Sequence, residues 1–288
     1  MLTLARQQDA GLAAWIEANA SFPNTMVDRI TPVPTTAEIE SFASDTGIND
    51  RASLSAEVFR QWVVEDDFVA GRPAWERVGA QFVEDVTPYE FMKLRLLNAS
   101  HLGVCALGQL SGYTLVSEAI GDDKIRRYMV ALMDRELCPT LMPVPGIDLD
   151  AYKCRLVARF ANRAIKDTTQ RVNTDAPINI LLDPLRDRLA ANESIDLLAL
   201  GLAAWLRRLQ STDEQGQPIR VVHPLADLLA EKAREGGGNP APLLSITALF
   251  GSLGRDPRVL AAVGEWLAAL YEIGTKATID RAADRGLL

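Results

Sequence analysis

Apolar residues recur three and four positions apart along most of the chain, the spacing of an amphipathic helix. The predicted helices cover residues 2–19, 36–46, 88–119, 122–136, 148–161, 182–191, 194–210, 224–234, 241–250, 256–272 and 275–284. Three early segments, 25–30, 58–64 and 79–86, mix β-branched and aromatic residues with polar ones and predict short strands. The joints between elements are short, so we expect one continuous, mainly α, multi-helical domain over residues 1–288, with a small β element near its N-terminus.

Composition narrows the class of protein. With 48% hydrophobic residues among 288, the chain can bury a large core. No stretch reaches the roughly 20 apolar residues of a membrane span, and charges near Met1 argue against a signal peptide, so the predicted location is cytoplasmic. The formal charge of −8 argues against nucleic acid as a partner. Three scattered cysteines and two histidines offer no zinc spacing, which favours a metal-independent protein.

Glycine placement bears on cofactor binding. A dinucleotide-binding domain normally has a Gly-x-Gly-x-x-Gly turn between a strand and a helix, where backbone N–H groups bind pyrophosphate. The run 236–238 follows a predicted helix and precedes Asn239-Pro240, so it predicts a loop instead. We therefore expect no Rossmann domain in this chain.

The helix that starts near Thr87 carries the most informative polar residues. Thr87 is predicted as its N-cap, Pro88 suits the first helical position, and Glu90 completes a capping box. At about 100° per residue, Lys93, Glu90, His101 and Asn98 then fall within roughly 140° on one side of the helix. This side is otherwise apolar, so the polar groups need partners, or their burial costs about 1–3 kcal/mol each.

Lysine, asparagine and histidine on one helix face suit alcohol and ketone chemistry. A partly desolvated Lys93 can take a hydroxyl proton, and the Asn98 amide can donate to an oxygen that gains negative charge. Structural roles remain open beside these: Lys93 as a surface lysine, Asn98 as a packing residue, His101 as a core histidine and Glu90 as a cap.

A hydrolase with a Cys–His pair is a further alternative, because Cys105 lies four residues after His101. Its apolar neighbours favour a packed core thiol. His223, in Val-Val-His-Pro before a predicted helix, is expected to help cap that helix.

The segment Phe22-Pro-Asn-Thr-Met-Val-Asp-Arg-Ile-Thr-Pro32 resembles the signature of the polyol-specific long-chain dehydrogenases, the mannitol dehydrogenase family. In the family's order follow Glu65-Asp-Asp-Phe68, Gly71-Arg-Pro73, Trp75-Glu-x-Val-Gly-Ala-Gln81, Thr87–His101 and Pro143-Val-Pro-Gly-Ile-Asp-Leu-Asp-x-Tyr152. The resemblance covers essentially the whole chain, most securely residues 22–173. It implies that residues 1–288 form the C-terminal, substrate-binding and catalytic domain of such an enzyme.

The resemblance also implies roles for the helix residues. Lys93 corresponds to the catalytic acid/base, and Asn98 to the asparagine that polarises the carbonyl or stabilises the alkoxide. His101 corresponds to a histidine that orients substrate, and Glu90 to a glutamate thought to pass protons between lysine and solvent.

The resemblance also implies substrate binding by two residues elsewhere in the chain. Arg171 matches an arginine that contacts substrate hydroxyls, and Asp28 matches the signature's aspartate. Surface salt bridges are the alternative for both. The chain departs from the family after Arg171, where the loop 175–180 is shorter and lacks a substrate-contacting lysine.

The resemblance implies NAD or NADP as cofactor, bound mainly by an N-terminal dinucleotide-binding domain that we expect to be missing here. The implied substrate is a polyol such as mannitol or arabinitol, or a mannonate-like sugar acid, with its ketose. We accordingly expect the isolated chain to be inactive unless a Rossmann domain joins it in cis or in trans. A non-catalytic helical remnant or interaction module is the alternative.

Overall fold

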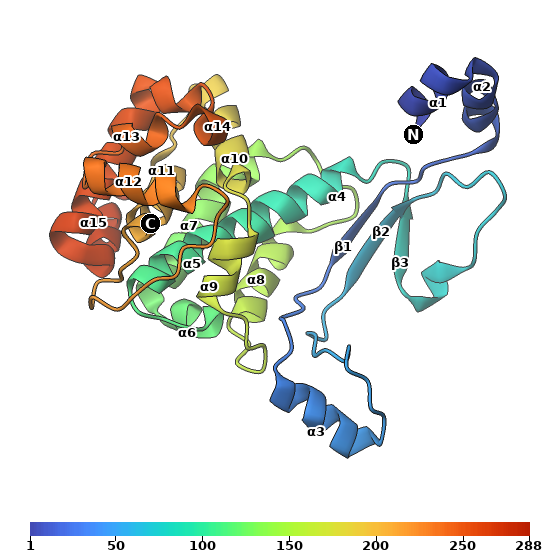
Figure 1. Cartoon of the computed structure of the whole chain (residues 1–288), viewed down its shortest axis with the longest axis horizontal. Helices are drawn as coiled ribbons and strands as arrows, with labels where there is room; N and C mark the ends of the chain where they lie inside the picture. The colour runs from blue at the N-terminus through green and yellow to red at the C-terminus, as the bar shows by residue number, and fades with distance from the viewer. The chain divides into compact units, whose positions relative to one another are not determined.

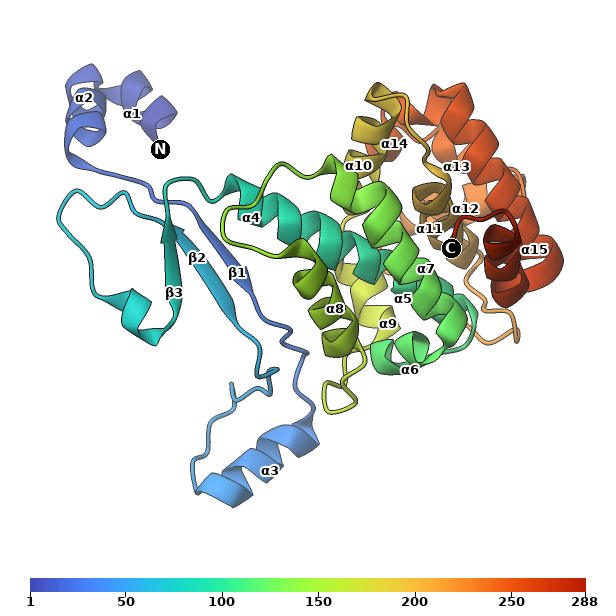
Figure 2. The same ribbon diagram turned by 180° about the vertical axis from the view of Figure 1, so that it is seen from behind.

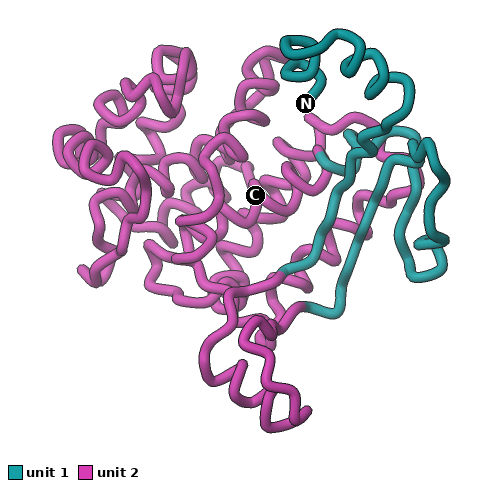
Figure 3. Tube along the Cα trace, turned by 45° about the vertical axis from the view of Figure 1, so that its right-hand side comes forward, with its two compact units in different colours: residues 1–30, 57–90 teal, residues 31–56, 91–288 magenta.

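The computed structural model describes all residues, 1–288, and forms two compact units (Figure 3). Unit 1 consists of residues 1–30 and 57–90, and unit 2 of residues 31–56 and 91–288. No helix in either unit is both long and apolar enough to cross a membrane.

Unit 1 contains a three-stranded sheet in the order β1-β2-β3. Strands β1 (Thr25–Asp28), β2 (Gln61–Glu65) and β3 (Ala80–Val83) overlap the three predicted segments. β1 pairs antiparallel with β2, placing Asp28 opposite Gln61, whereas β2 pairs parallel with β3. The remaining elements of unit 1 are α1 (Leu2–Gln8), α2 (Ala10–Asn19), η1 (Trp75–Val78) and the start of α4 (Thr87–Met92).

The predicted helix 2–19 is divided at Asp9. This residue is extended, and its carboxylate accepts hydrogen bonds from the backbone N–H groups of Gly11 (2.7 Å) and Leu12 (3.2 Å). An aspartate in this position caps a new helix, so α1 ends where α2 begins.

Unit 2 is helical. Its elements are α3 (Thr36–Thr46), η2 (Lys93–Ala99), α5 (Ser100–Leu110), α6 (Val116–Gly121), α7 (Asp123–Leu132), η3 (Met133–Leu137), η4 (Cys138–Thr140), α8 (Leu149–Phe160), α9 (Thr169–Asp175), α10 (Asn179–Ala190), α11 (Asp196–Arg207), η5 (Arg208–Gln210), α12 (Ala226–Gly236), α13 (Ala241–Leu244), α14 (Thr247–Phe250), η6 (Leu253–Arg255) and α15 (Pro257–Asp284).

Helix α5 forms the centre of unit 2, and every one of its residues is buried. Helices α6, α7, α9 and α11 pack against it (Figures 1 and 2). Gly103 on α5 and Gly201 on α11 leave space for the Tyr128 side chain, because a Cβ at either position would lie within 2.8 Å of the tyrosine oxygen. The Tyr128 hydroxyl donates to the Leu197 carbonyl at 3.1 Å, so the buried hydroxyl is paired.

Several predicted helix boundaries shift for identifiable reasons. The predicted helix 88–119 ends at Leu110, because Gly112 adopts a left-handed conformation with φ of 85°. Helix α9 was not predicted; the Thr168 hydroxyl caps it by accepting from the Arg171 backbone N–H. The predicted interruption after residue 272 is present as a break at Gly274, where φ is 76°.

Candidate active site

The helix that carries the candidate residues passes through three geometries: α4, then the π-helix η2, then α5. It begins at Thr87 itself, not after it as the predicted N-cap requires. The carboxylate of Asp85 accepts the Thr87 backbone N–H at 2.8 Å, and its hydrogen bonds to Thr87 lower the pKa of Asp85. The Asp85 side chain therefore caps the start of this helix, the role that the sequence predicted for Thr87.

The π-helix η2 begins at Lys93 and includes Asn98. Its hydrogen bonds run from residue i to i+5, so residues five apart lie on neighbouring turns. Lys93 and Asn98 therefore lie closer to one face than the roughly 140° expected from a regular α-helix. Wide turns of this kind are often found at functional sites.

The side of η2 away from these two residues is firmly anchored. The buried Arg95 donates to the Thr140 carbonyl at 2.7 Å and forms an ion pair with Asp187 on α10. Its guanidinium also lies over the Phe91 ring. The Ser100 hydroxyl donates to the Leu96 carbonyl at 2.5 Å, within the wide turn. These contacts anchor η2 to α10, to η4 and to its own flanking turns.

Lys93 and Asn98 are both half-buried. Within unit 2, neither side chain forms a hydrogen bond or an ion pair, and the Asn98 Oδ1 atom is fully buried without a partner. An unpaired buried acceptor costs about 1–3 kcal/mol, a cost that a ligand group donating to Asn98 would recover.

His101, on the first turn of α5, is buried and stacks on Phe160 with ring centroids 4.3 Å apart. Its Nε2 atom forms no hydrogen bond and lies 3.8 Å from Oδ2 of Asp167. Burial lowers the pKa of His101 to about 4; the negative charge of Asp167 opposes this shift, while Arg171 and Arg159 add to it. The imidazole is thus neutral near pH 7 and can act as a hydrogen-bonding group.

Arg171 on α9 is held by Asp167, a buried residue that the sequence did not single out. The Arg171 Nε and Nη2 atoms donate to the two Asp167 carboxylate oxygens, each at 2.5 Å, and this pairing raises the pKa of Arg171. A weaker contact of 3.4 Å joins Nη1 to Asp175. Because Asp167 is almost fully buried, the pair is not a surface salt bridge. The four-residue spacing of Asp167 and Arg171 was the available sequence signal.

Asp28 and Glu90 belong to unit 1. Asp28 ends β1 and is 2% exposed, which does not fit a surface salt bridge. Glu90 is exposed in the first turn of α4, where its backbone N–H donates to the Val86 carbonyl at 3.1 Å. The structure brings His101 and Arg171 together around Asp167 and places Lys93 and Asn98 on the turn before His101.

The Cys–His alternative loses support. Cys105 is fully buried, and burial raises the pKa of its thiol well above the usual value, so a thiolate nucleophile is not populated. His223 has the predicted capping role: its Nδ1 atom accepts the Leu225 backbone N–H at 3.0 Å, just before α12.

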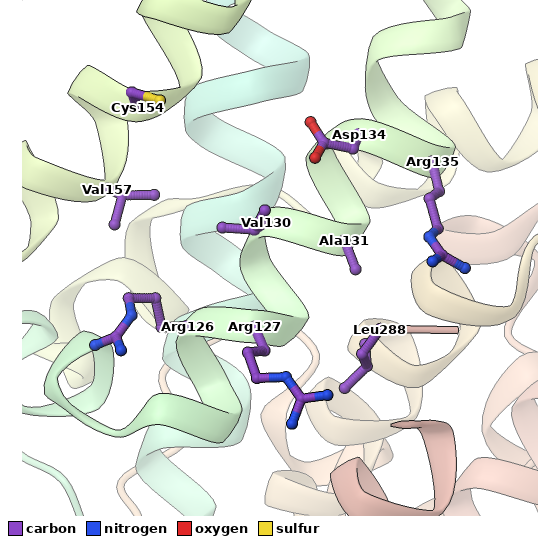
Figure 4. A pocket seen from close by; sticks show the side chains of 9 residues that line it. All are labelled: Arg126, Arg127, Val130, Ala131, Asp134, Arg135, Cys154, Val157 and Leu288. Carbon is purple, nitrogen blue, oxygen red and sulfur yellow. The ribbon is translucent and has the colours of Figure 1, made fainter. Parts of the chain in front are cut away.

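A separate pocket of about 520 Å³ lies between α7, η3 and α8 (Figure 4). Val130, Ala131, Val157 and Leu288 contribute apolar side chains to its lining, and Arg126 and Arg127 contribute charged ones. None of the predicted site residues lines it, so it gives no support to their assignment.

Comparison with known proteins places the whole chain. The model described as "Mannitol dehydrogenase C-terminal domain" matches residues 85–271, a range that contains Glu90, Lys93, Asn98, His101 and Arg171. The model described as "Mannitol dehydrogenase Rossmann domain" matches residues 2–77.

Two curated relatives from Escherichia coli (strain K12) are similar over most of the chain. D-mannonate oxidoreductase is 43% identical over 87% of this chain and 52% of its own length. The oxidoreductase YdfI is 42% identical over 96% of this chain and 58% of its own length. The chain therefore spans just over half the length of these relatives.

A solved structure is also similar to the chain over nearly its whole length. The complex of Pseudomonas fluorescens mannitol 2-dehydrogenase with NAD and D-mannitol matches 99% of this chain and 58% of that chain, with a TM-score of 0.87 and 38% identity.

These matches correct one expectation. The prediction that no Rossmann domain is present is wrong, because the Rossmann model matches residues 2–77 and the structural match covers 99% of the chain. The physical reason is that a glycine-rich turn marks only one strand–helix turn of that domain, so its absence does not exclude the rest. The expected inactivity of the isolated chain rested on the same inference and is unsupported. The resemblance itself is confirmed: the chain belongs to the mannitol dehydrogenase family.

Proposed function

We propose that this chain carries the substrate-binding and catalytic residues of an NAD-dependent oxidoreductase that interconverts a polyol, or a mannonate-like sugar acid, and its ketose. The observation that carries the proposal is the π-helix η2. Lys93 and the unpaired Asn98 oxygen lie on this one π-turn, and His101, with its own unpaired nitrogen, follows on the same helix.

Lys93 is the proposed general acid/base. In polyol oxidation its Nζ atom accepts the hydroxyl proton while a hydride leaves the carbon that bears this hydroxyl, so that a C=O bond forms. Lys93 suits this role because no carboxylate in unit 2 holds its amine. Glu90, three residues earlier and exposed, is the proposed route by which the proton reaches solvent.

The other residues orient the substrate. The Asn98 amide group offers a donor to the reacting oxygen, and its buried Oδ1 offers an acceptor to a hydroxyl or to the Lys93 ammonium. His101, neutral near pH 7, can bind a hydroxyl without adding charge. Arg171 and Asp28 are the proposed contacts to more distant hydroxyls. Since a polyol presents many hydroxyls, several fixed polar partners are needed to select one carbon for reaction.

NAD, or NADP, would accept the hydride. No Gly-x-Gly turn joins a strand to a helix among residues 1–288, so these residues show no pyrophosphate turn of the usual kind. Lys93, Asn98 and His101 fit the alcohol side of the reaction.

The test is NADH formation by the purified chain with mannitol, arabinitol and mannonate. Lys93→Met should lower the rate by about 10²–10⁴-fold, the usual contribution of general acid–base catalysis. Lys124→Met is the matched control, because Lys124 forms a surface ion pair with Asp280 on the remote helix α15. If Lys93→Met retains the wild-type rate, the assignment of Lys93 fails.

A further inference from the structure

Asp167 is a buried carboxylate whose backbone is fixed independently of its side chain. Its carbonyl accepts the Val116 backbone N–H at 3.0 Å, and the next residue, Thr168, forms a bridge with Leu115. The side chain is 3% exposed. Because the backbone contacts do not need the carboxylate, they do not explain why a charge is buried here.

The carboxylate lies between two of the proposed substrate-binding residues. Its two oxygens each accept one hydrogen bond from Arg171, and Oδ2 also lies 3.8 Å from His101 Nε2. A guanidinium has five N–H donors. Asp167 takes two of them and Asp175 one, which leaves two donors on a side chain that is still 30% exposed. The pair therefore fixes the Arg171 plane while leaving donors available.

The same carboxylate acts on the histidine. His101 is fixed on one face by stacking on Phe160, but Nε2 has no hydrogen-bond partner. A neighbouring carboxylate favours the neutral form that carries its proton on the nearer nitrogen. With Nε2 protonated, Nδ1 becomes the acceptor of the imidazole.

We propose that Asp167 is a positioning residue of the polyol site: it holds the guanidinium of Arg171 and sets the proton position of His101, so that both present fixed partners to substrate hydroxyls. This inference rests on the proposed function. Asp167 acts through these two residues and does not itself touch the substrate.

The experiment compares Asp167→Asn with Asp175→Asn, a matched control that removes the other, exposed carboxylate near Arg171. For Asp167→Asn we expect the KM for polyol to rise by about 10- to 100-fold with a much smaller change in kcat, because misplaced binding groups weaken substrate positioning. Asp175→Asn should stay within about twofold of wild type. An unchanged KM in Asp167→Asn overturns the proposal.

A double-mutant cycle tests whether Asp167 acts through Arg171. Arg171→Gln should also raise KM, and the double variant Asp167→Asn/Arg171→Gln should be no worse than Arg171→Gln alone. A KM for the double variant that reflects the product of the two single-variant increases would contradict the proposal. The double variant also serves if Asp167→Asn fails to fold, because it removes both charges and leaves neither unpaired.

Nitrogen NMR of the histidines gives a readout that does not need turnover. The chain has two histidines, so His223 is an internal reference. Wild-type His101 should carry its proton on Nε2; in Asp167→Asn the amide N–H faces this nitrogen, and the proton should move to Nδ1. Unchanged His101 signals would overturn the coupling. If the wild type forms no NADH, the proposed function fails while this measurement still decides the Asp167–His101 coupling.

Discussion

Two wide helical turns in this molecule bury polar groups and treat them in opposite ways. In η2 the Asn98 oxygen is buried without a partner. In η3 the buried Glu136 carboxylate accepts the backbone N–H groups of Leu197 (2.9 Å) and Leu198 (2.7 Å) at the start of α11. The N-cap residue of α11, Ile195, offers no side-chain acceptor, so Glu136 supplies acceptors from a distant part of the chain. The comparison teaches that a π-turn alone does not indicate a site, because the polar group of η3 is fully used in capping a helix.

The largest expected stability effect is at the satisfied turn. Glu136→Ala leaves two buried N–H groups without acceptors and should lower the free energy of unfolding by about 2–3 kcal/mol. Chemical denaturation followed by circular dichroism measures this. Glu193→Ala, which removes an exposed carboxylate nearby, should change the value by less than about 0.5 kcal/mol. Equal effects of the two variants would remove the distinction between the turns.

A related effect should appear in the pH dependence of stability. Burial raises the pKa of Glu136 to about 7, although the hydrogen bonds from Leu197 and Leu198 oppose the shift. Between pH 4.5 and 7 the folded state therefore binds more protons than the unfolded state, and stability falls as pH rises. The difference in unfolding free energy between wild type and Glu136→Gln should decrease over this window. A difference that grows with pH would show that the N–H groups at the start of α11 outweigh burial and lower the pKa of Glu136.

The sequence predicted most helices and the region of the sheet, because apolar spacing and capping residues are local. It did not predict η2, since the contacts that fix the π-turn, such as Arg95 with Asp187, join residues distant in the chain. The same holds for Asp167, whose closeness to His101 depends on how α9 packs on α5.

The candidate site residues were predicted from the polar residues on one helix face together with the family resemblance. Lys93, Asn98 and His101 lie on that helix, and Arg171 lies beside His101 through Asp167. The Rossmann prediction failed because it relied on one missing turn as evidence for a whole domain.

The most direct test of the central claim is to measure both stability and activity of Asn98→Leu. If the buried Asn98 oxygen is retained for substrate, an apolar residue of similar size should leave the free energy of unfolding unchanged or raise it by about 1 kcal/mol. Polyol-dependent NADH formation should fall by about 10²-fold or more. A destabilised variant that keeps wild-type activity would contradict the account, because Asn98 would then be a structural residue of η2.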